Sequence, residues 1–231
     1  MIKGFGILEM LISLSLGLGI LTVIIAHATE TGRVAKKITS NQERLEAIFH
    51  TVDTIKSDLN KCGMRLQEAC KFFNIPSFES SQGNFKVTYG LADEELLENA
   101  LPGQQTLKIT QNEFFKKDKV VLIYSLARQV WEFNEIGDFS GGALVLKNPL
   151  QNDFPANSPV LVLKKVEYKF YSAQRLLKRK TDKGNFQPLL EEVSDFYVTF
   201  FPDANSVLYR IEVNKKEQIR GYIFLLNLVQ P

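Results

Sequence analysis

The sequence predicts an α+β protein in which a long N-terminal helix, hydrophobic at first and then amphipathic, packs on an antiparallel β-sheet head. Three observations lead to this prediction. Residues 7–26 are apolar apart from a few small polar side chains, His27 follows them, and the only charge among them is Glu9. Residues 34–59 carry apolar side chains at intervals of three and four, which is the helical period. Beyond Pro102, runs rich in Val, Ile, Tyr and Phe are separated by turn-length gaps, as in antiparallel sheets.

Composition sets the scale and excludes some classes of protein. The chain has 231 residues, a formal net charge of +2 and 45% hydrophobic residues, which suits one domain with an appendage or at most two small domains. The low net charge argues against a nucleic-acid partner, which needs basic residues gathered on one face. The two His and two Cys residues lack the paired spacing of a structural zinc site. We therefore expect no metal and no cofactor.

The N-terminal segment is long enough for a membrane anchor. Ile7 to Ala26 comprises about 20 residues, which span a bilayer as a helix and exceed the apolar core of a secretory signal peptide. Lys3 precedes this span, while Arg33, Lys36 and Lys37 follow it. The positive-inside rule taken alone would place the C-terminal bulk in the cytoplasm.

The helical pattern continues well beyond the span. We expect one helix from about residue 5 to about residue 60, with a length of about 80 Å. Gly17 and Gly19 interrupt it, either as glycines that a membrane helix tolerates or as a notch for close packing. After Gly63 we expect a loop at 72–84 and a short helix at 91–101 that stops at Pro102.

The rest of the chain reads as strands joined by turns. Residues 182–185 and 214–216 have the composition of tight turns, and GDFSGG at 137–142 fits a hairpin loop. That stretch lacks the spacing of a catalytic serine turn. No catalytic constellation is present in the sequence, so we expect no enzyme. The expected strands lie at 106–110, 119–126, 129–136, 141–148, 159–172, 174–181, 193–201, 206–214 and 219–229.

The first residues carry a specific motif. Lys3 and Gly4 precede Phe5, an uncharged run follows, and Glu9 is the fifth residue counting from Phe5. This pattern resembles the class III leader of type IV pilins and type II secretion pseudopilins. The resemblance implies that a prepilin peptidase cuts between Gly4 and Phe5, that the amine of Phe5 is methylated, and that Glu9 acts in assembly. It divides the chain into a leader (1–4), a transmembrane and filament-core helix (5–62) and an extracytoplasmic head (63–231).

Departures from this family pattern favour a minor subunit over a major one. The leader has only four residues, Gly6 stands where a hydroxyl residue is usual, and no mid-span proline occurs near Ala26. In the head, VEYKF, RLLKRK, PLLEEVSDFYVTFF and SVLYRIEV follow one another between residues 166 and 213. This succession resembles the J-type minor pseudopilin of type II secretion and the W-type minor pilin of type IV pili. Residues 71–160 resemble nothing that we can place.

The resemblance implies a role in assembly. A minor pilin or pseudopilin helps to initiate or cap a filament, and contacts other minor subunits and the major subunit through a bundle of N-terminal helices. It also implies prepilin peptidase as a partner and a single pass through the bacterial inner membrane with the head outside the cytoplasm. Pilus and secretion pseudopilus both remain open. The alternative from another class is a single-pass membrane-anchored binding or sensor protein with an uncut N-terminus.

The two cysteines leave two alternatives. On a continuous helix Cys62 and Cys70 lie about 12 Å apart, whereas a disulfide needs Cα atoms within about 7 Å. Gly63 can end the helix and let the chain fold back. A disulfide outside the cytoplasm and a pair of buried thiols are therefore both possible.

A run of basic residues near the C-terminal third also has two interpretations. We interpret it as the solvated face of a hairpin, with a footprint for DNA or another acidic surface as the alternative. The run comprises Lys164, Lys165, Lys169, Arg175, Lys178, Arg179, Lys180 and Lys183.

Overall fold

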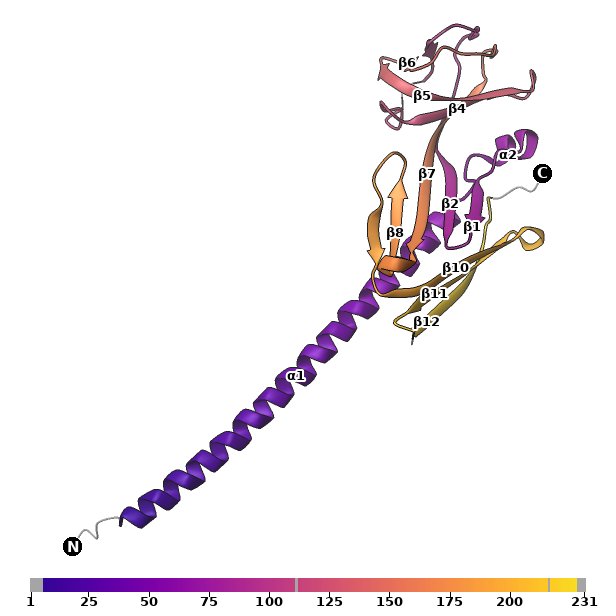
Figure 1. Ribbon diagram of the computed structural model, residues 1–231. Helices are drawn as coiled ribbons and strands as arrows, with labels where there is room; N and C mark the ends of the chain where they lie inside the picture. Colours follow the sequence, from indigo (N-terminus) through magenta and orange to yellow (C-terminus); the bar gives the residue numbers. More distant parts are fainter. Residues whose placement is uncertain (1–5, 111, 216, 228–231) are drawn as a thin grey trace. The chain divides into compact units, whose positions relative to one another are not determined.

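The computed structural model describes residues 6–110, 112–215 and 217–227. It has a long N-terminal helix, α1 (Ile7–Asn60), and a head rich in β-strands (Figure 1). Two compact units divide the chain: one ends at His50 and the other begins at Thr51. The last turns of α1 therefore belong to the head. The α+β prediction is confirmed, and the helix lies within the bounds that the periodicity predicts.

Helix α1 satisfies its own polar groups through most of its apolar part. Ser15, Thr22 and Thr31 donate their hydroxyl groups to carbonyls three or four residues earlier, at 2.8–2.9 Å. Such bonds within the helix allow these hydroxyl side chains in an apolar setting, because each of the three has an acceptor. With 54 residues, the helix is about 80 Å long.

The head contains two sheets. The larger has nine strands in the order β1-β2-β7-β4-β5-β6-β3, with β8 paired to β7 and β9 to β8, and the smaller has the order β10-β11-β12. The elements after α1 are α2 (Gln67–Phe73), β1 (Phe78–Ser81), β2 (Asn84–Glu95), β3 (Thr106–Lys108), β4 (Val120–Ser125), β5 (Val130–Ser140), β6 (Ala143–Leu146), β7 (Pro159–Tyr171), η1 (Ser172–Gln174), β8 (Leu176–Thr181), β9 (Gln187–Leu190), β10 (Val193–Phe201), η2 (Pro202–Ala204), β11 (Ser206–Val213) and β12 (Glu217–Phe224).

Strand β7 holds the larger sheet together. One of its edges pairs with β2 along almost its whole length. Its other edge pairs first with β4, through residues 160–163, and then with β8, through residues 166–171. In Figure 1, β7 runs from β4 to β8 accordingly. Residues 71–160, which matched no family pattern, therefore do not form a separate domain, because their strands β2 and β4 pair with β7 in one sheet.

The sheet around β4 and β7 is covered on both faces. Val121, Ile123 and Val160 face one apolar core. Leu122 and Leu161, which alternate with them, face a second core that includes Ala69 and Cys70 of α2. Strands buried on both faces carry continuous runs of apolar residues, which explains the sequences VVLIY and VLVL.

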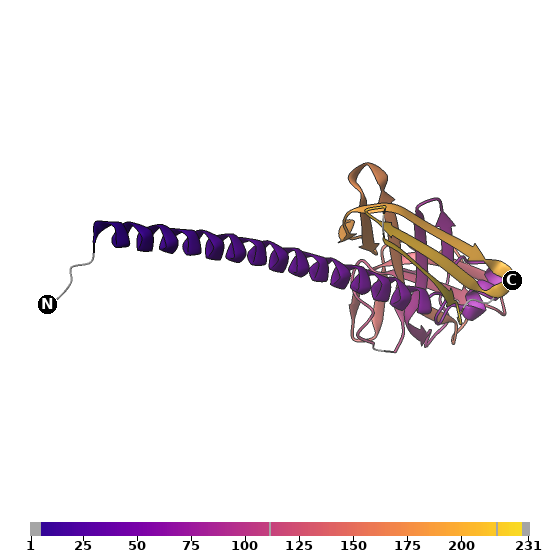
Figure 2. The ribbon, with the colours of Figure 1, turned by 90° about the horizontal axis from the view of Figure 1, so that it is seen from below.

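The smaller sheet forms a layer of its own beside β1 and β2, as Figures 1 and 2 show. Aromatic rings fill the space between these layers. Phe200 of β10 lies 5.2 Å from Phe78, and Phe196 lies 6.0 Å from Phe85, between ring centroids. Phe85 in turn stacks on Tyr168 at 4.4 Å. Ring pairs of this kind add to the apolar burial.

Two glycine positions are required by the backbone. Gly63 follows α1 with φ +72°, and a Cβ there would lie 2.5 Å from the carbonyl oxygen of Asn227. The chain can therefore fold back from the helix only with glycine at this position, as the sequence predicts. Gly141 and Gly142 have φ +58° and +79° and form the two-residue turn between β5 and β6. The expected hairpin is therefore present, but its loop is shorter than the expected 137–142, because residues up to Ser140 belong to β5.

The prediction of a helix at 91–101 is wrong. Residues up to Glu95 belong to β2, where Ala92 pairs with Val162 of β7, and the following residues make isolated bridges from Leu96 and Ala100. The segment has good helix formers, but pairing with β7 outweighs this local preference. The loop expected at 72–84 is wrong in part, because Phe78–Ser81 forms β1 in a hairpin with β2.

Candidate assembly site

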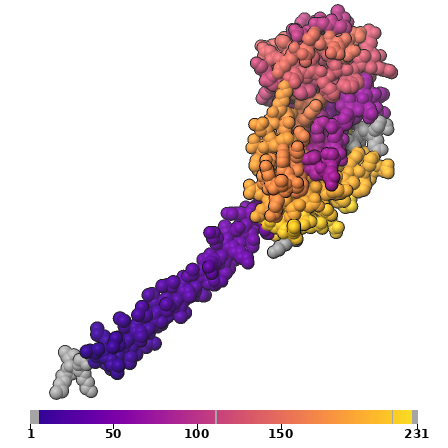
Figure 3. All heavy atoms as spheres, in the orientation of Figure 1, coloured from indigo at the N-terminus to yellow at the C-terminus, as the bar shows by residue number. Residues whose placement is uncertain are grey.

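The N-terminal part of α1 exposes apolar side chains on all its sides. Ile7 is 82% exposed and Val23 is 69% exposed. Among the described residues, α1 is the one helix that is both long enough and apolar enough to cross a membrane. Its most apolar stretch of 18 residues has a mean hydropathy of 2.2, and none of this stretch is buried. Figure 3 shows side chains along this indigo stretch. A helix that is apolar all round needs a lipid or protein environment.

Glu9 lies in the first turn of α1 and is tied to the backbone there. The backbone N–H of Gly6 donates to Oε2 of Glu9 at 3.2 Å, and the N–H of Glu9 donates to the carbonyl of Gly6 at 3.0 Å. The Glu9 side chain thus caps a free backbone N–H at the start of α1, which is the glutamate half of a capping box, and a carboxylate near a helix N-terminus also interacts favourably with the helix dipole. The side chain is exposed. Glu9 therefore has a local capping role that the sequence analysis missed.

Two shallow grooves on α1 are floored by glycine. One, of about 410 Å³, contains Ser15 and Gly19, and the other, of about 540 Å³, contains Ser13 and Gly17. The two pairs are offset by two residues, which is about 200° around the helix, so the grooves lie on opposite faces. Small residues four apart let a second helix approach closely. A Cβ added at Gly17 or Gly19 would meet nothing within 4 Å, so the surface there is open.

The expected cleavage and methylation sites, Gly4 and Phe5, lie outside the described residues. The described part of the chain begins at Gly6, one residue beyond the expected new terminus. Glu9 follows this expected terminus by four residues in the sequence.

A buried ion pair joins the end of α1 to the sheet. Asp58, whose side chain is 5% exposed, accepts hydrogen bonds from Arg179 of β8, from Nε to Oδ2 at 2.8 Å and from Nη2 to Oδ1 at 3.2 Å. Tyr168 of β7 donates its hydroxyl to Oδ2 of the same carboxylate at 2.5 Å. Tyr168 and Arg179 are direct neighbours in the β7–β8 ladder. We call these three residues the Asp58 clamp.

The clamp keeps the Tyr168 hydroxyl and the Arg179 guanidinium protonated. Burial raises the pKa of the Tyr168 hydroxyl, and the charge of Asp58 raises it further, so this group remains a donor. Burial acts to lower the pKa of Arg179, but its hydrogen bond to Asp58 and its other interactions outweigh burial and raise it. A bidentate pair of this kind restricts orientation as well as position. The clamp therefore sets the register of the last helical turns against β7 and β8.

The sequence carries a signal for the clamp: Asp58 and Arg179 both stand at positions in step with buried apolar residues. Asp58 lies on the same face of α1 as Ile55 and Leu59, which are both buried. Arg179 follows the buried Leu177 by two residues, so both point to the same face of β8. When a charged residue occupies a position on the buried face of each of two elements, as Asp58 and Arg179 do, the two residues are candidates for a buried ion pair.

Cys62 and Cys70 are free thiols in the structure, and both are buried. The structure thus has the arrangement of the second alternative, a pair of buried thiols. Cys62 Sγ donates to the carbonyl of Ser77 at 3.2 Å. Burial raises the pKa of the Cys62 thiol to about 12 and also raises that of Cys70, so both remain protonated and weakly nucleophilic at neutral pH.

The basic run lies on β7, β8 and the turn after them, as expected for a hairpin, but many of its charges have partners within the chain. Lys180 pairs with Glu167 at 3.8 Å, and the ammonium groups of Lys169 and Lys178 both lie over the Tyr171 ring. Arg179 is in the clamp and so is not part of a solvated face, which corrects the interpretation for that residue. These internal contacts leave less charge available for a nucleic acid.

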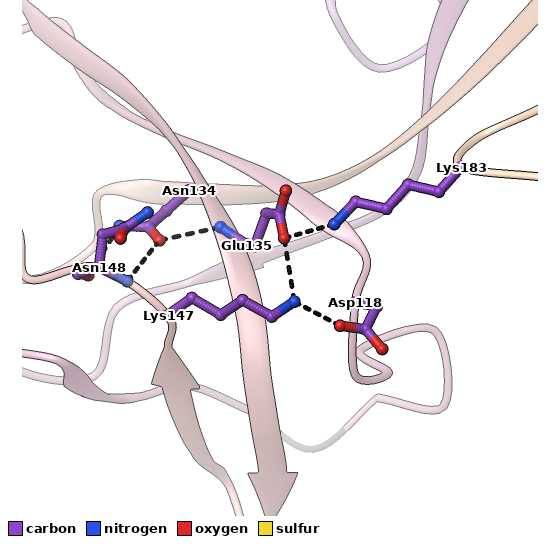
Figure 4. Close-up of polar contacts among 6 residues, drawn as sticks. All are labelled: Asp118, Asn134, Glu135, Lys147, Asn148 and Lys183. Atoms are coloured by element: carbon purple, nitrogen blue, oxygen red, sulfur yellow. Dashed lines mark hydrogen bonds and ion pairs between the residues drawn. The ribbon is translucent and has the colours of Figure 1, made fainter.

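Figure 4 shows a second polar cluster, formed by Asp118, Asn134, Glu135, Lys147, Asn148 and Lys183. Lys147 Nζ lies 2.5 Å from Asp118 Oδ1 and 3.1 Å from Glu135 Oε2, and Lys183 Nζ lies 2.5 Å from the same Glu135 atom. The bond from Lys183 is the main cause that lowers the pKa of Glu135, and the bond from Lys147 lowers that of Asp118. Asn134 is buried, but the ion-paired side chains lie at the surface, so these ion pairs order the turn after β8 more than they stabilise the fold.

An acidic hollow of about 690 Å³ lies beside α2, with Glu68, Asp93, Glu94 and Glu95 among its lining residues. Most of these carboxylates have partners: Arg65 lies 3.2 Å from Asp93, and Glu94 and Glu68 accept hydrogen bonds from Asn112 and Tyr124. Among the described residues, no group of three or more His, Cys, Asp or Glu side chains is arranged to hold a metal ion. Neither a family model nor a curated protein matches this chain.

Proposed function

We propose that this chain is a minor subunit of a type IV pilus or of a type II secretion pseudopilus, which helps to initiate or cap the filament. Its role is structural and not catalytic. The precursor is held in the bacterial inner membrane by one pass of α1, with the head outside the cytoplasm. Prepilin peptidase cuts between Gly4 and Phe5, the amine of Phe5 is methylated, and the subunit then joins a bundle formed by the N-terminal helices of other minor subunits and the major subunit.

The observation that carries the proposal is the length over which α1 exposes apolar side chains. A membrane anchor needs about 20 residues, and Ile7–Ala26 provides them. Yet Val34, Ile38 and Leu45, beyond that span, are still 49%, 53% and 44% exposed. Their helical spacing forms an apolar stripe that the bilayer does not cover. A bundle of similar helices would cover this stripe, as well as the two glycine-floored grooves, whereas a plain anchor would leave it in water.

A filament also gives the charge of Glu9 a partner. A carboxylate in an apolar setting is tolerated when it is paired. Cutting after Gly4 creates an amine on Phe5, and the corresponding amine of a neighbouring subunit can approach Glu9 in the bundle. A membrane-anchored binding or sensor protein, the second candidate function, provides no such partner.

Sedimentation from native cells lysed in mild detergent tests the proposal. We expect the chain to sediment at high speed together with the major filament subunit, because detergent dissolves the membrane but leaves the helix bundle intact. A single-pass anchored binding or sensor protein would stay in the supernatant. Recovery of the whole chain in the supernatant, from cells whose filaments sediment normally, would rule the proposal out.

A further inference from the structure

Strand β12 is an unusual edge. It forms the outer strand of the β10-β11-β12 sheet, and no other described strand pairs with its far side. All eight of its residues pair with β11 without a bulge, and it contains no proline. Proteins usually keep exposed edges short or interrupted, because a long regular edge can pair with another chain.

Three other edge strands in the described part of the chain follow that rule. The edge strands β1, β3 and β9 have only four, three and four residues. Strand β10, at the opposite edge of the small sheet, contacts β1, β2 and β8. Strand β12 differs from these three edge strands: it has eight residues, it pairs regularly with β11, and no described strand lies on its outer side.

The outer face of the small sheet carries aromatic side chains next to this edge. Tyr222 and Phe224 of β12 are 65% and 64% exposed, and the ring centroid of Phe201 of β10 lies 6.5 Å from that of Tyr222. The small Ser206 lies between Phe201 and Phe224 in the pairing register. Ser206 is buried, and the three aromatic side chains form an exposed apolar patch that an added strand could extend.

The charge of Arg220, on the same face of β12, favours an added strand that carries a carboxylate. Arg220 of β12 lies directly opposite Arg210 of β11, and like charges in this position disfavour pairing. Arg210 is neutralised by Asp195, with Nη2 2.7 Å from Oδ2. Arg220 is exposed, and none of the ion pairs among the described residues includes it. A carboxylate placed beside Arg220 would therefore be favourable.

We propose that β12 accepts an extended acidic segment of a different polypeptide as a fourth strand of the small sheet. The main chain of this segment pairs with the outer edge of β12, its alternate apolar side chains cover Tyr222 and Phe224, and a carboxylate lies beside Arg220. This is recognition by β-strand addition. A second copy of this chain fits less well, because it brings another Arg220 to the same edge. The inference does not depend on processing of the N-terminus.

Photo-crosslinking in native cells tests the inference. The full chain carries Tyr222→p-benzoylphenylalanine, and mass spectrometry identifies the crosslinked peptide. We expect one peptide from another protein, with alternating apolar residues and an Asp or Glu. We also expect Arg220→Glu to reduce its yield at least tenfold and Arg220→Lys to retain it, since only the first change reverses the charge. The control carries p-benzoylphenylalanine at Phe72 of α2, which is 59% exposed, and should not yield this peptide.

A charge exchange separates recognition from a change in folding. Replacing the acidic residue of the crosslinked peptide by Arg should restore the yield with Arg220→Glu. The inference is wrong if the product is a dimer of this chain, if no peptide crosslinks at Tyr222, if the yield is insensitive to Arg220→Glu, or if the exchange fails to restore it.

Discussion

Replacing Glu9 by glutamine is expected to leave cleavage after Gly4 intact and to lower the amount of subunit that sediments with filaments at least tenfold. The glutamine side chain still accepts the hydrogen bond from the Gly6 N–H and so preserves this cap of the helix. It removes the charge that would attract the amine of Phe5 in a neighbouring subunit. The result therefore separates the two roles of Glu9, because only the charge is lost.

Two further variants control this experiment. Glu30→Gln removes another exposed carboxylate of α1 and should sediment as the unchanged chain does. Glu9→Ala removes both the charge and the cap, so its assembly should be no better than that of Glu9→Gln. If Glu9→Gln assembles normally while Glu9→Ala does not, the side chain serves only to cap the helix, and the role in assembly proposed for its charge is wrong.

Replacing Arg179 by alanine is expected to lower the free energy of unfolding of the head by about 2–4 kcal/mol. The change leaves Asp58 buried without its cation, and breaking a buried pair in this way typically costs about 3–5 kcal/mol. We place the value somewhat lower because the side chain of Arg179 is 26% exposed. Urea unfolding of the full chain in detergent, followed by the fluorescence of its single tryptophan, Trp131, measures the difference.

Neighbouring positions on β8 provide the control for the clamp. Lys180 alternates with Arg179 and makes a weak ion pair at 3.8 Å and a contact with the Phe186 ring at 5.5 Å from its centroid. Both contacts are at the surface, so Lys180→Ala should change the free energy of unfolding by less than about 0.5 kcal/mol. The triple variant Asp58→Leu, Tyr168→Phe, Arg179→Met removes every charge and hydroxyl of the clamp together. It should be more stable than Arg179→Ala, since no buried polar group is left unpaired. Equal stability of Arg179→Ala and Lys180→Ala would show that the clamp contributes little.

The features that the sequence predicted correctly are those with a strong periodic pattern. Helix α1 follows from the apolar span and from the three-and-four spacing after it, and the nine expected strands follow from alternation or from continuous β-branched runs. The break after α1 at Gly63 and the hairpin near Gly141 follow from the φ values that only glycine adopts readily. In each case a local pattern and the final structure agree.

The features that the sequence analysis missed depend on contacts between distant residues. LADEELLENAL suits a helix locally, and its pairing with β7 is set by residues about 70 positions away in the chain. The Asp58 clamp likewise joins residues 121 positions apart, and only the burial phase of each element hinted at it. The bond from the Gly6 N–H to the Glu9 side chain is an exception, because it joins residues three apart and a glutamate in the first helical turn is a local signal for a cap.

The mass of the N-terminal peptide of the chain purified from its native cells tests the central claim most directly. The account predicts that the chain begins at Phe5 and carries a methyl group on its amine, and that Gly4→Arg abolishes this product. Residues 1–4 would then be absent from the mature protein. A chain that begins at an intact Met1 would contradict the account and would favour a membrane-anchored binding or sensor protein.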